Sequence, residues 1–569
     1  MTNSKIGYII GGGLKDSFSA RLTVDPLSVQ EGGFVVIDSG YTRFYGLVTD
    51  LQLGATDPRF ADEQSETRLP PAIAKALHGQ TLYTNLEILP ALMLERGPDP
   101  KSPEYAAWRS EHAEDARPMP VKTVPLHHAN VSLADATDIA AIFGDPQKDG
   151  NFVIGYTREQ GHPVCINLDK FIQRSAGVFG ATGTGKSFLT RIILAGLMNH
   201  NKASVLVLDM HNEYGFDDVA SDTKQNVIGL KTKFGNQVQI IGVGAGATIR
   251  GRAPSFNLEI PMSEISTSDV ETLSRELNLK ETTPTTLNAL FTSFRTDWFA
   301  RFRAMNREEV EEIDEKGRVR RVPHPDSVAF WAQASGVNVM AAEALHDKLR
   351  RLFDKPYIVA APAADSVAQV IQTLESGKHV ILSFGSHESD LDYLFVSNLL
   401  TRKIRAAWEA KTNQFRSRGA KLVNEPRPLI IVVEEAHKLL NREMAAQTTF
   451  ATIARELRKY YVTLLIVDQR PSQIYDEVMS QLGTRICGWL GDDLDIQAAL
   501  SGLAGRDALR GMLARLQPKE EVLLLGWGVP MPLPVHSRRY DAVFWQDLLK
   551  NSHFKDKTIA EKTNLLFDS

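Results

Sequence analysis

The sequence predicts an α/β protein whose main part is a parallel sheet with crossover helices. From residue 176 onward, short apolar segments alternate with helical patterns, as in strands joined by helices. The first fifty residues instead hold short apolar segments separated by glycines, which is typical of a small barrel. Between residues 263 and 377 the pattern is mostly amphipathic helix, broken by a charged, hairpin-like piece at 307–321, so a helical insertion is expected between two strands of the sheet.

Length and composition fit a globular protein of two or three domains. The 569 residues exceed one typical domain, and 43% hydrophobic with 23% charged residues is ordinary. We expect no membrane segment and no signal peptide, since no apolar run reaches the roughly 18 residues of a membrane span. Cys165 and Cys487 are too few for a disulfide framework, so a cytoplasmic location is expected. The net charge of −5 argues against a surface that attracts nucleic acid everywhere, but allows a basic channel inside an assembly.

Five regions follow from these patterns. The predicted barrel has strands at 6–10, 18–24, 34–37 and 45–53, a polar excursion with helical pieces from 57 to about 120, and a returning strand at 121–126. The predicted regions are a barrel domain (1–150), the first part of the core (151–262), the helical insertion (263–377), the second part of the core (378–540), and a C-terminal helix and tail (541–569). The core strands are expected at 176–179, 204–209, 238–243, 379–384, 429–433, 462–467, 485–489 and 522–526.

A glycine-rich loop follows the first core strand and precedes a helix. It reads Gly180, Ala181, Thr182, Gly183, Thr184, Gly185, Lys186, Ser187, which fits the P-loop pattern. In such a loop the backbone N–H groups and the helix N-terminus hold phosphates, the lysine contacts the β/γ oxygens, and the serine hydroxyl ligates Mg²⁺. Although a glycine-rich loop can match by chance, the strand and helix around it favour an ATP and Mg²⁺ site.

Two acids end the strand that begins near Leu429. We assign Glu434 to Mg²⁺, through a water, and Glu435 as the base that activates the attacking water. The alternative is that both acids only solvate the end of a strand. At the end of the next strand, Gln469 is a candidate sensor of the γ-phosphate. An equally good interpretation is that Gln469 is only a turn residue before Pro471.

Several segments together resemble the HerA family of the FtsK–HerA translocases. They are RSAGVFGATGTGKS (174–187), VLVLDMHNEY (205–214), IIVVEEAH (430–437), IARELRKY (453–460) and DQRPSQI (468–474). The resemblance implies a RecA-like P-loop ATPase core with a small N-terminal barrel of the HAS-barrel kind. The sequence departs from the family at Glu434, usually Asp, at Asn212, often Gly, and at Asp468, commonly Thr.

The resemblance also implies a homo-hexamer that holds ATP between subunits, where a neighbour's arginine contacts the γ-phosphate. Arg458 is the first choice for this finger and Arg455 the second, because the two share a helix face. Arg174 and Arg485 are weaker candidates, and Glu213 is a weak candidate near the catalytic acids. The ordinary alternative for each arginine is a structural ion pair.

The function implied is an ATP-driven translocase or helicase for double-stranded DNA. The family pairs with NurA-like nucleases in DNA end processing, and similar ATPases pair with phage-defence effectors. We expect such a partner to dock on the N-terminal domain, which has no nucleotide motif. The alternatives are a scaffold that activates an effector enzyme and, less well matched by the motifs, a peptide-remodelling ATPase.

Overall fold

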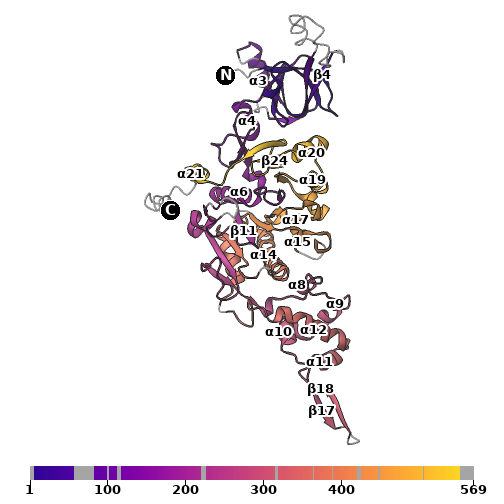
Figure 1. Cartoon of the computed structure of the whole chain (residues 1–569). Coiled ribbons are helices and arrows are strands. Elements are labelled where there is room, and N and C mark those ends of the chain that lie inside the picture. Colours follow the sequence, from indigo (N-terminus) through magenta and orange to yellow (C-terminus); the bar gives the residue numbers. More distant parts are fainter. Residues whose placement is uncertain are drawn as a thin grey trace. The chain divides into compact units, whose positions relative to one another are not determined.

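The structure is a computed structural model, and it divides the chain into two compact units. The first unit comprises residues 1–193, 469–472 and 482–544, and the second comprises 194–468, 473–481 and 545–569. The residues described are 5–56, 82–98, 101–111, 117–219, 224, 226–313, 318–362, 364–387, 389–418, 424–445, 449–503 and 505–550. Figure 1 shows the course of the chain.

A closed antiparallel barrel opens the first unit (Figure 1). Its strands are β1 (Lys5–Gly12), β2 (Phe18–Leu22), β3 (Phe34–Ser39), β4 (Thr42–Ala55), β5 (Leu82–Glu95) and β7 (Asn130–Leu133), with the short β6 (Met119–Pro120) beside β5. Pairing of β2 with β5 closes the ring, which encloses buried side chains such as Phe18, Val35 and Ile88. Closure leaves no long unpaired edge, and the sequence prediction of a barrel is confirmed.

Two details of the predicted barrel are wrong. The segment read as a polar excursion contains β5, a 14-residue strand that pairs with β4 along almost its full length. Residues 121–126 form no strand, and β7 at Asn130–Leu133 closes against β1 and β3 instead. Polar residues on the outer face of a barrel strand weaken its sequence signal, because only alternate side chains enter the core. The helical pieces expected between 57 and 81 lie outside the described residues.

The rest of the first unit is a mixed sheet with helices. Its strand order is β10-β23-β24-β25-β8-β9, and only the pair β10–β23 is parallel. These strands are β8 (Asn151–Tyr156), β9 (Pro163–Asn167), β10 (Ala176–Phe179), β23 (Thr484–Cys487), β24 (Glu521–Gly526) and β25 (Leu533–Ser537). The helices are α3 (Glu104–Glu111), α4 (Ala136–Phe143), α5 (Leu168–Phe171), α19 (Asp493–Ala499) and α20 (Arg506–Ala514).

The second unit contains six parallel strands in the order β15-β14-β20-β11-β21-β22. They are β11 (Ser204–Asp209), β14 (Val238–Val243), β15 (Phe256–Leu258), β20 (His379–Ser383), β21 (Leu429–Glu434) and β22 (Val462–Asp468). Every residue of β11, β20, β21 and β22 is buried, as expected for parallel strands with helices on both faces. Their helices are α7 (Leu230–Phe234), α13 (Ser366–Glu375), α14 (Asp390–Arg418), α15 (His437–Leu440), α16 (Arg442–Ala445), α17 (Thr449–Glu456) and α18 (Asp476–Gln481). Two helices cross from one unit to the other along the chain, α6 (Lys186–His200) and α21 (Ala542–Lys550).

The expected helical insertion lies between β15 and β20 of the second unit. It holds α8 (Thr267–Glu271), α9 (Thr283–Phe294), α10 (Trp298–Ala304), α11 (Val328–Ala334) and α12 (Val339–Phe353), with β16 (Ile260–Pro261) paired to β19 (Ile358–Val359). Trp298, Phe299, Phe302 and Phe353 form a buried aromatic cluster at its centre. The charged segment near residue 310 forms the expected hairpin, β17 (Glu309–Ile313) with β18 (Val319–Pro323), which Figure 1 shows as a ribbon. A further small pair joins β12 (Asp218–Val219) to β13 (Asn226–Val227).

A basic cluster on α14 holds the insertion to the core of the second unit. Arg402 donates two hydrogen bonds to the carboxylate of Asp269, which is fully buried. Lys403 forms an ion pair with Glu264, and Arg405 forms one with Glu409. These cations therefore have structural partners. Among the described residues, no helix is long and apolar enough to cross a bilayer.

Candidate nucleotide site

The glycine-rich loop of the first unit lies between β10 and α6, as its motif requires. Gly183 and Gly185 have φ angles of 76° and 89°, which are favourable only for glycine. The Thr184 hydroxyl donates to the carbonyl of Ala181 at 2.7 Å, and the Lys186 ammonium donates to the same carbonyl at 3.0 Å. The loop is thus curled on itself, and the lysine lies across it. Because Lys186 and Ser187 begin α6, they lie where the helix dipole favours phosphate.

Gln469 lies against this loop within the first unit. The Thr182 hydroxyl donates a hydrogen bond to the Gln469 amide oxygen. Three residues further on, the backbone N–H and hydroxyl of Ser472 donate to Asp495 at 3.1 and 2.6 Å. A contact between Gln469 and the phosphate-binding loop is what a γ-phosphate sensor requires. Its sensing role stays a prediction.

Glu434 ends β21 in the second unit, in a buried and acidic setting. The Tyr214 hydroxyl donates to its Oε1 at 2.7 Å, and the Tyr393 hydroxyl donates to its backbone carbonyl at 2.7 Å. Burial raises the pKa of Glu434 well above its usual value, and the negative charge of Asp209 adds to the rise. Glu213 contributes in the same direction, so the structure brings this weak candidate close to Glu434. The backbone N–H groups of Glu213 and Tyr214 donate to Asp209 at 2.8 and 3.1 Å, and this fixes the turn after β11.

The surroundings of Glu434 fit a Mg²⁺ ion. Glu434 is only 5% exposed, and its Oε2 is buried without a hydrogen-bond partner in the described part of the chain. A buried oxygen of this kind is unfavourable unless a cation or water occupies the space beside it. Within the described ranges, no group of three or more His, Cys, Asp or Glu side chains is arranged to hold a metal. Mg²⁺ is commonly bound through one or two carboxylates, waters and substrate phosphates.

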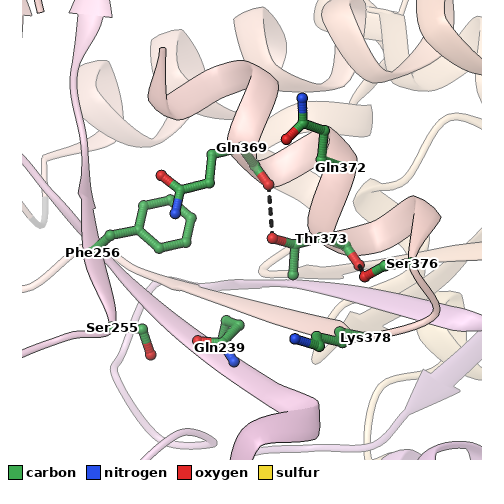
Figure 2. A pocket seen from close by; sticks show the side chains of 8 residues that line it. All are labelled: Gln239, Ser255, Phe256, Gln369, Gln372, Thr373, Ser376 and Lys378. Atoms are coloured by element: carbon green, nitrogen blue, oxygen red, sulfur yellow. Dashed lines mark hydrogen bonds between the residues drawn. The ribbon is translucent and has the colours of Figure 1, made fainter. Parts of the chain in front are cut away.

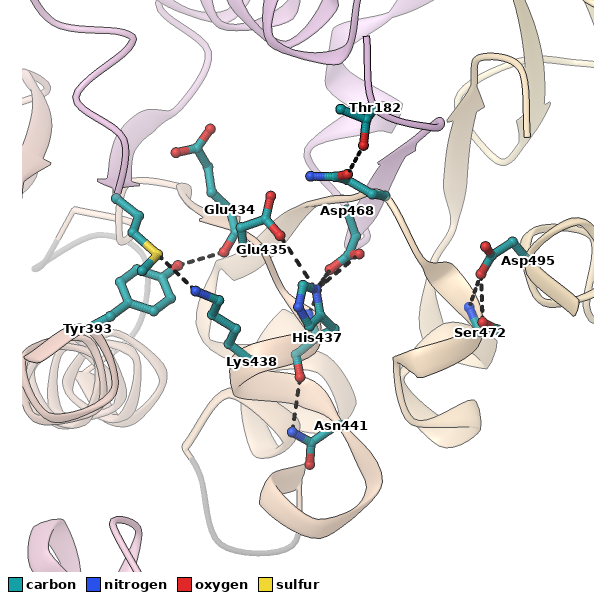
Figure 3. A network of polar contacts seen from close by, with 12 residues as sticks. Thr182, Tyr393, Glu434, Glu435, His437, Lys438, Asn441, Asp468, Ser472 and Asp495 are labelled. Atoms are coloured by element: carbon teal, nitrogen blue, oxygen red, sulfur yellow. Dashed lines mark hydrogen bonds and ion pairs between the residues drawn. The ribbon is translucent and has the colours of Figure 1, made fainter. Parts of the chain in front are cut away.

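Glu435 has an unusual backbone for a glutamate. Its φ is 45°, in the left-handed region. The carboxylate lies 3.7 Å from Nδ1 of His437, whose ring and backbone N–H also contact Asp468 at the end of β22 (Figure 3). The hydrogen bond to Asp468 is the main cause that raises the pKa of His437.

The arginine candidates fall into different environments. Arg458 is exposed on the 3₁₀ turn Leu457–Tyr460, whereas Arg455 lies in α17, and its side chain is outside the described residues. The expected shared α-helical face is interrupted, because α17 ends at Glu456. Arg174 stacks on Trp527, with its guanidinium 4.2 Å from the ring centre.

Arg485 has a structural position that does not suit a finger reaching another subunit. It is 3% exposed, and its guanidinium donates to the carbonyls of Ala499 and Ser501 at 2.7 Å each. Burial lowers its pKa. Its position just before a predicted strand gave no sign of this burial.

Sequence reasoning assigned no role to four residues around the catalytic acids. Tyr214 and Tyr393 contact Glu434, His437 lies beside Glu435, and Asp468 contacts His437. The available signal was the position of Asp468 at a strand end. A second signal was the position of His437, two residues after Glu435.

A separate polar groove lies in the second unit, near the beginnings of strands β14 and β20. Its volume is about 340 Å³. Figure 2 shows the lining residues, which are Gln239, Ser255, Phe256, Gln369, Gln372, Thr373, Ser376 and Lys378. Gln239 and Lys378 lie near the beginnings of β14 and β20, whereas Asp209, Glu434 and Asp468 lie where β11, β21 and β22 end. The groove is therefore no part of the acidic site.

Comparisons with known proteins show which ATPases the chain is similar to. Residues 152–404 match the family model of the HerA helicase central domain. The chain is 23% identical over 484 residues to the DNA double-strand break repair helicase HerA of Sulfolobus acidocaldarius, covering 84% of this chain and 82% of the relative. It is 23% identical over 548 residues to the protein of that name from Sulfurisphaera tokodaii, covering 94% and 93%.

A solved structure, VirB4 of Thermoanaerobacter pseudethanolicus, aligns with a TM-score of 0.42 at 14% identity, covering 70% of this chain and 99% of that one. The match to the family model and the similarity to the two relatives confirm the HerA resemblance expected from the motifs. The chain is an ATP-hydrolysing enzyme of this P-loop type.

Proposed function

We propose that the protein is an ATP-driven motor that moves double-stranded DNA as a ring of six subunits. The observation that carries the proposal is a curled P-loop with Lys186 and Ser187 on the same chain as the buried Glu434 and its neighbour Glu435. Similarity to HerA helicases over most of the chain supports DNA as the substrate.

The roles within the site follow from the chemistry of each side chain. Lys186 and the loop N–H groups bind the β- and γ-phosphates, and Ser187 and Glu434 hold Mg²⁺, the glutamate through a water. Glu435 accepts the proton of the attacking water, and Gln469 detects the γ-phosphate. Mg²⁺, when bound, neutralises the charge that develops on the phosphate oxygens.

The ring requires a cation from the adjacent subunit at each ATP site. We assign this role to Arg458, which is exposed on its turn, whereas Arg485 is buried and donates to two carbonyls. Arg455 is the second choice. The N-terminal barrel has no nucleotide motif, and we propose that it docks a partner nuclease of the NurA kind or a phage-defence effector.

The test is the ATPase rate of the full chain against duplex DNA concentration at two ionic strengths. We expect stimulation that weakens as salt rises, since phosphate contacts release counterions. ATP-dependent displacement of the third strand from a DNA triplex then measures movement along the duplex. If duplex DNA does not stimulate hydrolysis at low salt, and the triplex keeps its third strand, the motor proposal is refuted.

A scaffold that assembles and activates an effector enzyme is the second candidate. The barrel supports it, because it is a closed domain and its sequence holds none of the ATP motifs. In that case the effector's activity should depend on the chain and on ATP binding, while the third strand stays in place.

A further inference from the structure

Asp468, His437 and Glu435 form a line of contacts at the carboxyl ends of β21 and β22. The Asp468 side chain is completely buried, whereas the side chains of His437 and Glu435 are 25% and 19% exposed. Asp468 Oδ2 accepts a hydrogen bond from the backbone N–H of His437 at 2.7 Å, and it lies 3.0 Å from Nδ1 of the same residue. Glu435 Oε2 lies 3.7 Å from the same Nδ1 atom of His437. All three residues belong to the second unit.

The chemistry of these groups places a proton on Nδ1 of the imidazole. A carboxylate only accepts hydrogen bonds, so the Nδ1 facing Asp468 carries a proton. Asp468 is also the main cause that raises the pKa of His437, with Glu435 acting in the same direction and with burial and the cation of Lys438 opposing both. The raised pKa favours the cationic form of His437, which has one buried and one partly exposed carboxylate beside it. Attraction to that cation restricts where the Glu435 carboxylate can lie.

The backbone at Glu435 also requires support. A left-handed φ is unfavourable in a residue other than glycine and persists when surrounding contacts enforce it. The carbonyl of Glu435 accepts the N–H of Lys438 at 2.9 Å, while its carboxylate faces the His437 ring. The turn and the ion pair together direct the glutamate side chain.

We propose that His437, held in place by Asp468, is a positioning residue that orients the Glu435 carboxylate for activation of the attacking water. The inference rests on the proposed function, in which Glu435 is the base. Asp468 acts one step further away, by fixing both the ring and the first N–H of α15.

The experiment measures steady-state ATP hydrolysis and nucleotide affinity for variants of the full chain. His437→Asn should lower kcat by about 10- to 100-fold, the loss typical of a misplaced catalytic group, with nucleotide affinity and KM changed by no more than about twofold. Asp468→Asn keeps an acceptor for the His437 N–H and removes the charge, so it should lower kcat in the same way but less. The control is Asn441→Ala, which removes a 3.0 Å hydrogen bond to the His437 carbonyl and leaves the ring contacts alone. We expect this control to keep kcat near that of the parent protein.

A double-mutant cycle separates positioning from a general structural effect. If His437 acts through Glu435, His437→Asn should cause no further loss of kcat in a Glu435→Gln protein. An equal loss in both backgrounds, or unchanged turnover in the single variant, would overturn the proposal. Failure of the underlying function would look different, because Glu435→Gln alone would then hydrolyse ATP at the parent rate. Nucleotide affinity reports that each variant is folded, and Asp468→Asn provides the independent test if His437→Asn does not fold.

Discussion

Replacing Tyr214 by phenylalanine tests whether Glu434 serves the metal. The variant removes the hydroxyl that donates to Glu434 Oε1 at 2.7 Å and leaves the ring in place. This hydrogen bond lowers the pKa of Glu434, against burial and the charge of Asp209, which raise it. Without the hydrogen bond, the protonated acid is favoured further, and Mg²⁺ must compete with that proton.

The size of the effect follows from the cost of losing a hydrogen bond to a charged group, about 1.5–3 kcal/mol in a buried setting. Since about 1.4 kcal/mol corresponds to tenfold in an equilibrium constant, apparent Mg²⁺ affinity should weaken by about 10- to 100-fold. The assay is the ATPase rate against free Mg²⁺ at saturating ATP. The maximal rate should recover at high Mg²⁺, because the carboxylate itself remains.

Tyr393→Phe is the matched control. It also removes a fully buried tyrosine hydroxyl that donates at 2.7 Å to Glu434, but the acceptor is the backbone carbonyl. Tyr393→Phe should lose about 1 kcal/mol of stability and Tyr214→Phe about 1.5–3 kcal/mol, and only Tyr214→Phe should change the Mg²⁺ dependence. Equal shifts in the two variants, or no shift in Tyr214→Phe, would refute the assignment of Glu434 to the metal.

Three further predictions concern other parts of the protein. Lys186→Ala should abolish ATP binding or hydrolysis, which nucleotide titration and phosphate release would detect; wild-type hydrolysis would contradict the phosphate role. Arg458→Ala rings should be inactive, but mixing them with Lys186→Ala subunits should restore some hydrolysis, since an intact pocket then meets an intact finger; mixed rings verified by mass spectrometry and showing no rescue would exclude Arg458. His379 is buried and its pKa is lowered to about 3, so the unfolded state binds more protons below about pH 6.5 and the free energy of unfolding should fall there, by up to roughly 1.4 kcal/mol per pH unit. His379→Leu should flatten this dependence in denaturant titrations, and an unchanged slope would assign the acid sensitivity to other groups.

The sequence by itself determined the elements that depend on neighbouring residues. Strands β10, β11 and β14 have the predicted bounds, because continuous apolar runs signal strands covered on both faces. The glycine-rich loop was recognisable because its glycines, lysine and serine stand at fixed spacing between a strand and a helix. The helical insertion and its charged hairpin were predicted on the same local grounds.

Only the tertiary structure decided which side chains meet. Tyr214 and Glu434 are 220 residues apart, and His437 and Asp468 are 31 apart, so no local pattern announces either contact. The burial of Arg485 depends on carbonyls of a later segment, and the closure of the barrel depends on pairing of β2 with β5. Periodicity reports whether a side chain faces the core, whereas the identity of its partner is set when the ends of distant strands are brought to one edge of a sheet.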